Sequence, residues 1–308
     1  MENTFIGQVF KGENDWWRYV IGILIVLIGW QVIGVIPLVS LGVMYTSNKS
    51  ELMRAAQDNF MSLGIDNNLF LVALLLMFVF GLLFLCIAVR SVHKRDFKTV
   101  LTSRAKFDWK RFFFAFVLWF AVGAVMIFVD YWSHPEDFIW NFDPMKFAVL
   151  FVISFALIPL QTSFEEIFMR GYLMQGIGGL AKNRWLPLII TSLIFGLLHG
   201  LNPEVAKLGN QLMIYYISTG LLFGVITLMD EGLELPMGLH AANNIVAALL
   251  VTTDWTVFQT EALWIDTSEP QLSMLMYIPV FIIYPILLFV LSRKYQWKDW
   301  GEKLLGKI

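Results

Sequence analysis

Long apolar stretches constrain the fold of this sequence more than any other feature. A helix that crosses the hydrocarbon core of a bilayer needs about 20 mostly apolar residues. Eight stretches are candidates, at about 18–45, 69–91, 110–132, 145–176, 186–200, 210–229, 235–252 and 273–292. Only 15% of the 308 residues are charged, compared with about 25% in soluble domains. We therefore predict an all-α, polytopic membrane protein with about eight transmembrane helices.

The chain is predicted to form one transmembrane domain over residues 1–308, because no repeat or low-complexity linker divides the sequence. A net charge of −2 without a basic stripe argues against nucleic acid as a partner. Cys86 is the only cysteine, which excludes an intramolecular disulfide and a zinc site built from cysteines. Pro37 and Pro159 lie inside two long stretches, where we expect kinks or tilts.

The connections between the apolar stretches differ sharply in charge. The 90–111 connection holds eight Lys and Arg residues and the 293–308 tail holds five, whereas the 130–145 and 252–273 connections hold none. Lys and Arg concentrate in cytoplasmic connections, and eight crossings place both basic segments on one side. We therefore expect an integral membrane protein whose two termini both lie in the cytoplasm. The compact connections fit a protein of the bacterial plasma membrane.

A few polar side chains interrupt the apolar stretches away from their ends. They are Glu165, Glu166, Arg170, His199, His240, Asn243 and Asn244. An ionisable side chain at bilayer depth costs about 2.5–3.5 kcal/mol on insertion scales, so these residues are kept where they pair or serve a function. These residues fall on three of the predicted helices, and the rise per residue of a helix places them in the middle or the cytoplasmic half of the bilayer. The sequence thus predicts a polar site within the membrane.

Helix geometry sorts these residues by face. Glu166 and Arg170 are four residues apart, which predicts an ion pair along the helix. Glu165 points about 100° away from Glu166, so it is free for a different partner. His240 and Asn244 share a face. A purely structural reading is the alternative, in which these groups only hold the helices together.

Two kinds of chemistry fit the same residues. Hydrolysis needs a base that activates water and donors that stabilise the oxyanion. Glu165 with His199 fits the first need, and His240 with Asn244 fits the second. Two histidines and a carboxylate also resemble a catalytic zinc shell, although the sequence has no H-E-x-x-H motif. The residues alone leave glutamate-activated and metal-activated water both open.

Two non-hydrolytic functions are the competing interpretations. A membrane scaffold or immunity protein would bind a peptide partner and keep the polar residues for structure. A transporter would use an intramembrane carboxylate to couple proton flux, but interrupted helices in matching halves, which mark such sites, are not evident.

Three motifs in order resemble a known family. EEIFMR (165–170) matches E-E-x-x-x-R, FGLLH (195–199) matches F-x-x-x-H, and HAANN (240–244) matches H-x-x-x-N. Their order and helix placement resemble the CAAX-protease and bacteriocin-processing family (CPBP or Abi), which includes the Rce1-like prenyl-protein endopeptidases. The resemblance covers about residues 140–252.

The resemblance implies an intramembrane glutamic-type endopeptidase that requires no cofactor and no metal, although the family has also been regarded as metalloproteases. Glu165 would be the general base with His199 as its partner. His240 and Asn244 would form the oxyanion hole, and Glu166 with Arg170 would complete the first motif. The implied partner is a peptide or a membrane-anchored protein, lipidated or not, and bacteriocin self-immunity is a related role.

Overall fold

The computed structural model describes residues 4–271 and 274–308. Helices account for most of this length. Their bounds are α1 (Trp16–Leu27), α2 (Ile36–Tyr45), α3 (Lys49–Ala55), α4 (Asn67–Ile87), α5 (Trp109–Ser133), α6 (Pro144–Glu166), α7 (Gln175–Ala181), α8 (Trp185–Leu198), α9 (Pro203–Leu208), α10 (Leu212–Asp230), α11 (Glu234–Leu250), α12 (Tyr284–Tyr295) and α13 (Trp300–Leu305). Four π-helical segments extend them, at Ile28–Ile33, Ala88–Val92, Ile167–Met174 and Pro279–Ile283.

The helices confirm an all-α, polytopic membrane protein. Within the described residues, five helices are long and apolar enough to cross a membrane, namely Trp16–Tyr45, Asn67–Val92, Trp109–Ser133, Pro144–Ala181 and Leu212–Asp230. The other three predicted stretches are helical over most of their described length but shorter, as in α11 with 17 residues. The total of eight crossings therefore stays a prediction.

The two prolines differ in their effect. A turn at Gly34 and Val35 separates the π-helical segment Ile28–Ile33 from α2, which carries Pro37 in its first turn. By contrast, α6 continues through Pro159 without a break. The departure from regular α-helix comes later, in the π-helical segment Ile167–Met174. Segments of this kind are frequent at functional sites.

Aspartate caps begin three of the long helices. The side chain of Asp66 accepts a hydrogen bond from the Leu69 backbone at the start of α4. The side chain of Asp108 likewise accepts from backbone N–H groups at the start of α5. The side chain of Asp143 does so at the start of α6, where Pro144 lies in the first turn. Each cap satisfies backbone N–H groups that have no partner within the helix. The caps therefore fix where these helices begin at the ends of the bundle.

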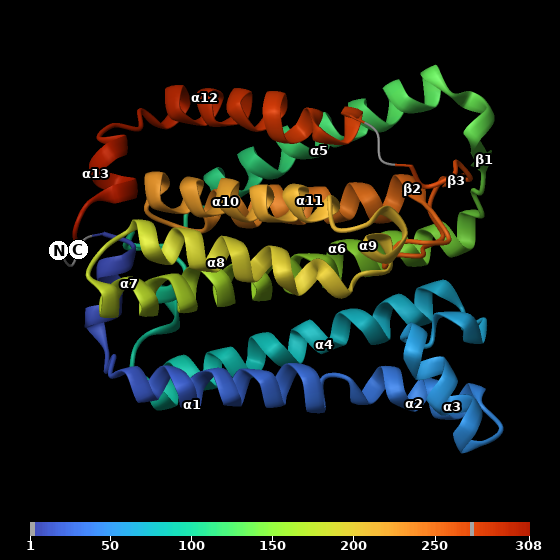
Figure 1. Ribbon diagram of the computed structural model, residues 1–308, viewed down its shortest axis with the longest axis horizontal. Helices are drawn as coiled ribbons and strands as arrows, with labels where there is room; N and C mark the ends of the chain where they lie inside the picture. The colour runs from blue at the N-terminus through green and yellow to red at the C-terminus, as the bar shows by residue number, and fades with distance from the viewer. Residues whose placement is uncertain (1–3, 272–273) are drawn as a thin grey trace.

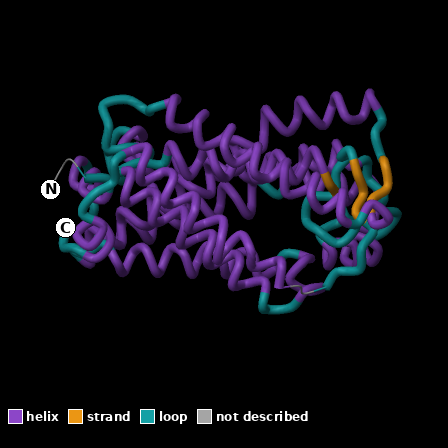
Figure 2. Tube along the Cα trace, turned by 90° about the horizontal axis from the view of Figure 1, so that it is seen from above, coloured by secondary structure: helices purple, strands orange, loops and turns teal. Residues whose placement is uncertain are grey.

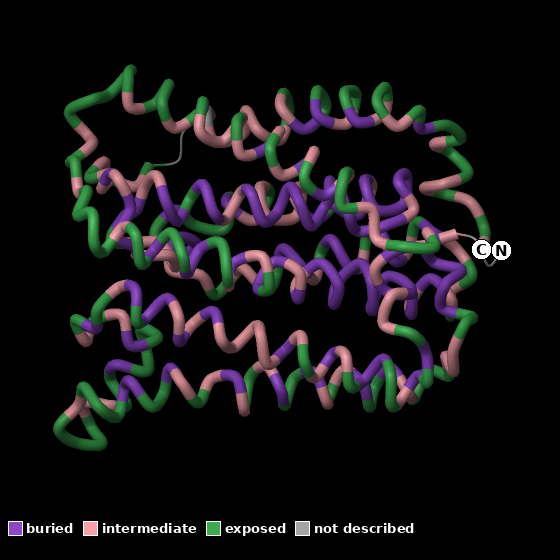
Figure 3. The backbone as a smooth tube through the Cα atoms, turned by 180° about the vertical axis from the view of Figure 1, so that it is seen from behind, coloured by how far each residue is buried: buried purple, intermediate pink, exposed green. Residues whose placement is uncertain are grey.

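The helices lie side by side in layers (Figure 1). α4 packs on α6, α6 on α11, α11 on α5, and α8 on α10. The central helices are buried, whereas the outer ones carry exposed residues along their length (Figure 3). Trp132, Val152 and Phe289 are among the exposed apolar side chains. An apolar surface this extensive is suited to lipid rather than to water.

Three short strands join the two acidic connections at one end of the bundle. β1 (Phe138–Trp140) pairs antiparallel with β3 (Trp264–Asp266), and β2 (Val251–Thr252) pairs parallel with β3. Both chain termini lie at the opposite end (Figure 2). We call these the strand end and the terminus end. The acidic connections thus lie together, as expected from the sequence, although the sheet that joins them was not predicted.

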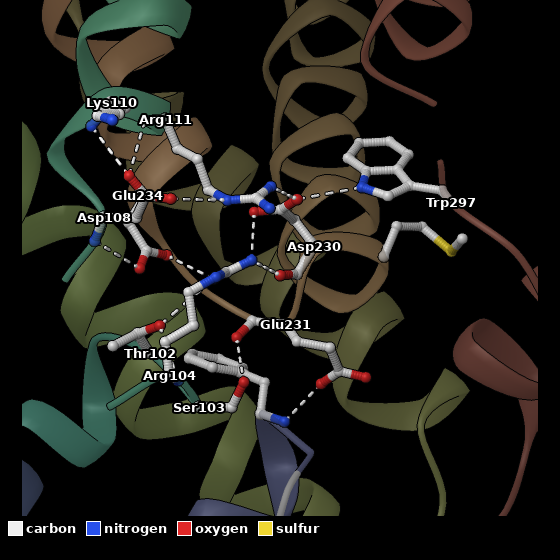
Figure 4. Close-up of polar contacts among 12 residues, drawn as sticks. Thr102, Ser103, Arg104, Asp108, Lys110, Arg111, Asp230, Glu231, Glu234 and Trp297 are labelled. Atoms are coloured by element: carbon white, nitrogen blue, oxygen red, sulfur yellow. Dashed lines mark hydrogen bonds and ion pairs between the residues drawn. The ribbon is translucent and has the colours of Figure 1, made fainter. Parts of the chain in front are cut away.

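Buried ion pairs fasten the basic 90–111 connection at the terminus end (Figure 4). Arg104 contacts Asp230 and Glu234, each at 3.0 Å, and Arg111 pairs with the other oxygen of Asp230. Trp297 from the C-terminal tail donates to Asp230 at 3.1 Å. Asp230 and Glu234 are both buried, so each carboxylate depends on these cationic partners. The cluster fixes the start of α11, the helix that carries His240.

His93 illustrates a connection residue that is nevertheless buried. Its Nδ1 lies 2.8 Å from the Glu13 carbonyl oxygen and its Nε2 lies 2.8 Å from the Tyr172 hydroxyl. The pKa of His93 is lowered from 6.5 to about 4, mainly by burial; the hydrogen bond with the Glu13 carbonyl opposes this shift, and the nearby Arg95 and Arg18 add to it. The imidazole is therefore neutral in the folded protein at neutral pH.

This pKa shift makes folding stability depend on pH. Because the unfolded chain takes up a proton at His93 below pH 6.5 and the folded protein only near pH 4, stability falls between these values as the pH drops. We expect His93→Gln to remove part of this fall. The measurement is thermal unfolding of both proteins in detergent across pH 4–8. An equal dependence of stability on pH in both proteins would show that groups other than His93 cause the fall at acidic pH.

Candidate active site

Glu166 is held at the centre of the bundle by two cationic or donor groups. It ends α6 and is fully buried. Its Oε1 accepts from Arg170 Nη1 at 3.0 Å and lies 2.9 Å from His240 Nδ1. The ion pair with Arg170 that the spacing predicts is therefore present. Because a carboxylate only accepts, His240 must carry its proton on Nδ1 at this contact.

Arg170 is also completely buried, and three elements surround it. Its Nη2 donates to the Gly220 carbonyl oxygen at 3.0 Å, and its guanidinium lies 4.4 Å from the ring centroid of Phe195. Gly220 also lets α10 pack closely on α8, since a Cβ there would lie 2.8 Å from the Ser192 backbone oxygen. Arg170 thus links α6, α8 and α10 through one charge.

Glu165 differs from its neighbour because part of its side chain is open. The side chain keeps 15% of its exposure. Its Oε1 accepts from Gln161 Nε2 at 2.6 Å, whereas Oε2 has no hydrogen-bond partner among the described residues. The nearest cationic group to Oε2 is His240 Nε2 at 3.6 Å, which is too long for a direct hydrogen bond. His240 therefore lies between the two glutamates.

A chain of amide hydrogen bonds ends at Glu165. Trp119 donates to Asn243, Asn243 to Asn244, Asn244 to Gln161, and Gln161 to the carboxylate, with distances of 3.2, 3.2, 3.0 and 2.6 Å. The indole only donates and the carboxylate only accepts, so the two ends fix the orientation of every amide between them. Such a chain holds Glu165 Oε1 in place and leaves Oε2 free.

Gln161 and Trp119 are parts of this chain that the sequence analysis missed. Gln161 lies four residues before Glu165 on one helix, so its position was readable from the helical period. Trp119 lies on α5, outside all three motifs, and nothing in the sequence ties it to Asn243. Asn243 also belongs to this chain of hydrogen bonds. Asn244 lies one step closer to Glu165 along the chain than Asn243 does.

His199 lies apart from the other motif residues. It follows α8 directly, and its Nδ1 lies 2.8 Å from the Phe195 carbonyl oxygen. Its ring stacks on Tyr216 with 4.5 Å between centroids. Among the described contacts, none joins His199 to Glu165, the partner expected from the resemblance. The histidine beside Glu165 is His240.

A cavity of about 580 Å³ brings the remaining candidates together. Glu165, His199, His240 and Asn244 all line it. Glu166 and Arg170 do not line it; they lie behind His240 and contact it or its partner. Across the described residues, no group of three or more His, Cys, Asp or Glu side chains is placed to hold a metal ion.

Comparisons with known proteins point in one direction. A family model described as type II CAAX prenyl endopeptidase Rce1-like matches residues 144–246, a range that contains all three motifs. The chain is also 30% identical over 266 residues to the uncharacterized protein YyaK of Bacillus subtilis (strain 168). The aligned region covers 83% of this chain and 84% of that protein. No solved structure matches the chain.

Proposed function

This chain belongs to the Rce1-like family of CAAX prenyl endopeptidases, and we propose that it hydrolyses a peptide bond within the membrane by a water that Glu165 activates. The observation that carries the proposal is the free Oε2 of Glu165. This oxygen is buried and faces His240 Nε2 across 3.6 Å, and it belongs to a carboxylate that Gln161 holds, on a residue that lines the cavity. A water that contacts both groups from the cavity side would be oriented for attack.

In the proposed reaction, Glu165 takes a proton from this water as its oxygen bonds to the carbonyl carbon of the substrate. The oxyanion that forms accepts hydrogen bonds from His240 Nε2–H and from the second N–H of Asn244. Glu165 then returns the proton to the leaving nitrogen as the C–N bond breaks. The step uses no metal. His199 also lines the cavity, where it would contact the substrate or assist the water.

Glu166 and Arg170 act on this step through His240. A donor at Nε2 requires the imidazolium form, because Nδ1 already donates to Glu166. Two carboxylates flank the ring, Glu166 at 2.9 Å and Glu165 at 3.6 Å. With Arg170 included, the two acids and two cations sum to zero charge. A neutral group of four is far less costly to bury than an unpaired charge.

The proposed active unit is the whole chain rather than the part that the family model matches. The cavity wall includes Trp30 before α2, Phe78 on α4 and Trp119 on α5. Tyr284 on α12 lines it as well. These residues lie outside 144–246, so we propose that residues 1–308 form a single domain and that the substrate contacts helices beyond the three motifs.

The proposal is tested by incubating purified protein with a library of quenched-fluorescent peptides, lipidated and unlipidated, with and without a strong chelator. We expect cleavage that survives the chelator. Loss of cleavage with the chelator and its return with zinc would instead place His199 and His240 in a metal shell. A folded protein that binds library peptides without cleaving any would favour the scaffold function.

Asn244→Ala is expected to slow cleavage by about 10²–10³-fold, the usual effect of removing one oxyanion donor. The change also interrupts the amide chain between Asn243 and Gln161. Asn243→Ala is the matched control, since it breaks the same chain one residue further from Glu165 and removes no proposed oxyanion donor. Comparable rates in the two variants would assign the effect to the chain and not to the oxyanion.

A further inference from the structure

Three arginine side chains are buried among the described residues, and one of them lacks a carboxylate. Arg170 pairs with Glu166 at 3.0 Å, and Arg184 lies 3.6 Å from Glu231. Arg95 is only 4% exposed, yet no Asp or Glu of the described chain forms an ion pair with it. A buried cation without a counter-charge is strongly unfavourable. The described fold therefore leaves the charge of Arg95 uncompensated.

The guanidinium of Arg95 is held along one edge and unpaired along another. Its Nη1 donates to Gln175 Oε1 at 3.0 Å, and Gln175 is oriented in turn because its Nε2 donates to the Thr99 carbonyl oxygen at 2.8 Å. Nε and Nη2 are buried, but neither has a hydrogen-bond partner among the described residues. These two nitrogens share the edge of the planar group that binds two oxygens of a carboxylate or a phosphate side by side.

Tyr19 supplies a third donor beside this edge. Its side chain is 7% exposed, and its hydroxyl also lacks a hydrogen-bond partner among the described residues. The ring packs on His93 with 4.5 Å between centroids, and Tyr19 lies within electrostatic range of Arg95. Buried polar groups are nearly always paired with protein, with water or with an ion. Three neighbouring donors without an acceptor therefore indicate a ligand that accepts hydrogen bonds.

The acids closest to Arg95 in this part of the structure have other partners. Glu13 pairs with Arg18 and, at 2.8 Å, with Lys94. Asp96 accepts a backbone N–H group at the start of the short 3-10 helix that follows it. Neither carboxylate contacts Arg95 among the described contacts, so the missing negative charge would have to come from outside the chain.

The unpaired donors lie where the chain meets the surface of the membrane. Tyr19 belongs to the first turn of α1, close to the exposed Trp16 and Trp17, and tryptophans of this kind mark the interface between lipid and water. Arg95 belongs to the 90–111 connection, which holds eight Lys and Arg residues. Basic pockets between transmembrane helices bind anionic lipid head groups, so the surroundings favour an anion at this level.

We propose that Arg95 and Tyr19 form a binding site for a phosphate group. Nε and Nη2 of Arg95 donate to two of its oxygens, and the Tyr19 hydroxyl donates to one of them. A phosphate group carries the charge that Arg95 lacks and has enough acceptor oxygens for all three donors. An anionic phospholipid and free phosphate both present this chemistry. Neither residue lines the cavity that holds Glu165, so the site is separate from the proposed active site.

A ligand in this site would act on the helix that carries the first motif. α6 continues through the π-helical segment Ile167–Met174 into α7, which begins at Gln175, the partner of Arg95. Tyr172 in the same segment contacts His93 Nε2 at 2.8 Å. A phosphate group held by Arg95 would therefore restrain the basic connection against this helix. Because such a ligand binds only the folded protein, it raises the temperature of unfolding.

Thermal unfolding in maltoside micelles, which contain no phosphate, tests the site without any cleavage. The purified protein is titrated with inorganic phosphate, with sodium chloride at matched ionic strength and, in a separate series, with phosphatidylglycerol. We expect a saturable rise in Tm of at least about 2 °C with a phosphate-bearing probe and none with sodium chloride. A rise with phosphatidylglycerol alone identifies a lipid ligand, and a rise with inorganic phosphate alone identifies a soluble one. No rise with either probe would overturn the proposal.

Arg95→Met is expected to weaken the binding of the active probe by about tenfold or more, because two charge-assisted hydrogen bonds are lost. Arg90→Met is the matched control: Arg90 is exposed in the same basic connection, so this change removes the same charge and should leave the titration unaltered. Equal affinity in Arg95→Met and the unmodified protein, or equal weakening by Arg90→Met, would overturn the site.

Tyr19→Phe is the second variant, since it removes only the hydroxyl and keeps the ring that packs on His93. We expect it to weaken binding several-fold through the loss of one hydrogen bond. If Arg95→Met does not fold, this variant decides in its place, and an unchanged titration in Tyr19→Phe would then overturn the site. None of these outcomes depends on whether the protein is a protease.

Discussion

Glu165→Gln is expected to eliminate peptide cleavage while the protein remains folded. The glutamine side chain has nearly the same shape and can still interact with Gln161, but it cannot accept a proton from water. General-base catalysis contributes about 10²–10⁴-fold, so the residual rate should fall below detection in a fluorescence assay. Binding of a library peptide should persist, because the cavity wall is otherwise unchanged.

The matched control is Glu261→Gln. The Glu261 side chain keeps 11% of its exposure, close to the 15% of Glu165, and pairs with Lys146 at 3.2 Å at the strand end. It does not line the cavity. Both variants are compared with the unmodified protein for elution volume, thermal unfolding and cleavage. Equal cleavage by Glu165→Gln and the unmodified protein would show that Glu165 is not the base.

The sequence predicted which residues meet along one helix, and it could not predict how separate helices are rotated against each other. The spacing of Glu166 and Arg170 gave their ion pair directly. The contact of His240 with both glutamates depends on the packing of α11 against α6, which no local pattern encodes. For the same reason, the stacking of His199 on Tyr216 was not visible in its motif.

The ends of the bundle show the same division. Charge counts predicted that the two acidic connections lie together, and the pairing of Phe138 with Asp266 places them in one sheet. In this sheet β1 and β3 lie more than 120 residues apart in the sequence, and all three strands are short, so their propensity signal was too weak to detect. The cavity is a property of side chains from many helices, and it was not visible in any one motif.

Arg170→Met is expected to lower the free energy of unfolding by about 3–5 kcal/mol, the cost of leaving a buried charge without its partner. Arg170 is entirely buried, and its loss would leave Glu166 with His240 as its only cationic contact. The measurement is unfolding in detergent, by heat or by SDS titration. Arg293→Met is the control: Arg293 is exposed on α12, and surface changes of this kind stay within about 0.5 kcal/mol.

The double variant Glu166→Gln with Arg170→Met separates structure from catalysis at this pair. Removing both charges of a buried ion pair is often nearly neutral for stability, so the double variant should recover most of what Arg170→Met loses. The amide oxygen introduced by Glu166→Gln would still accept from His240 Nδ1, but it would no longer favour the imidazolium that the proposed oxyanion contact requires. A double variant that is stable yet slow supports the role of Glu166 through His240. A double variant that regains both stability and full turnover would assign the pair to structure alone.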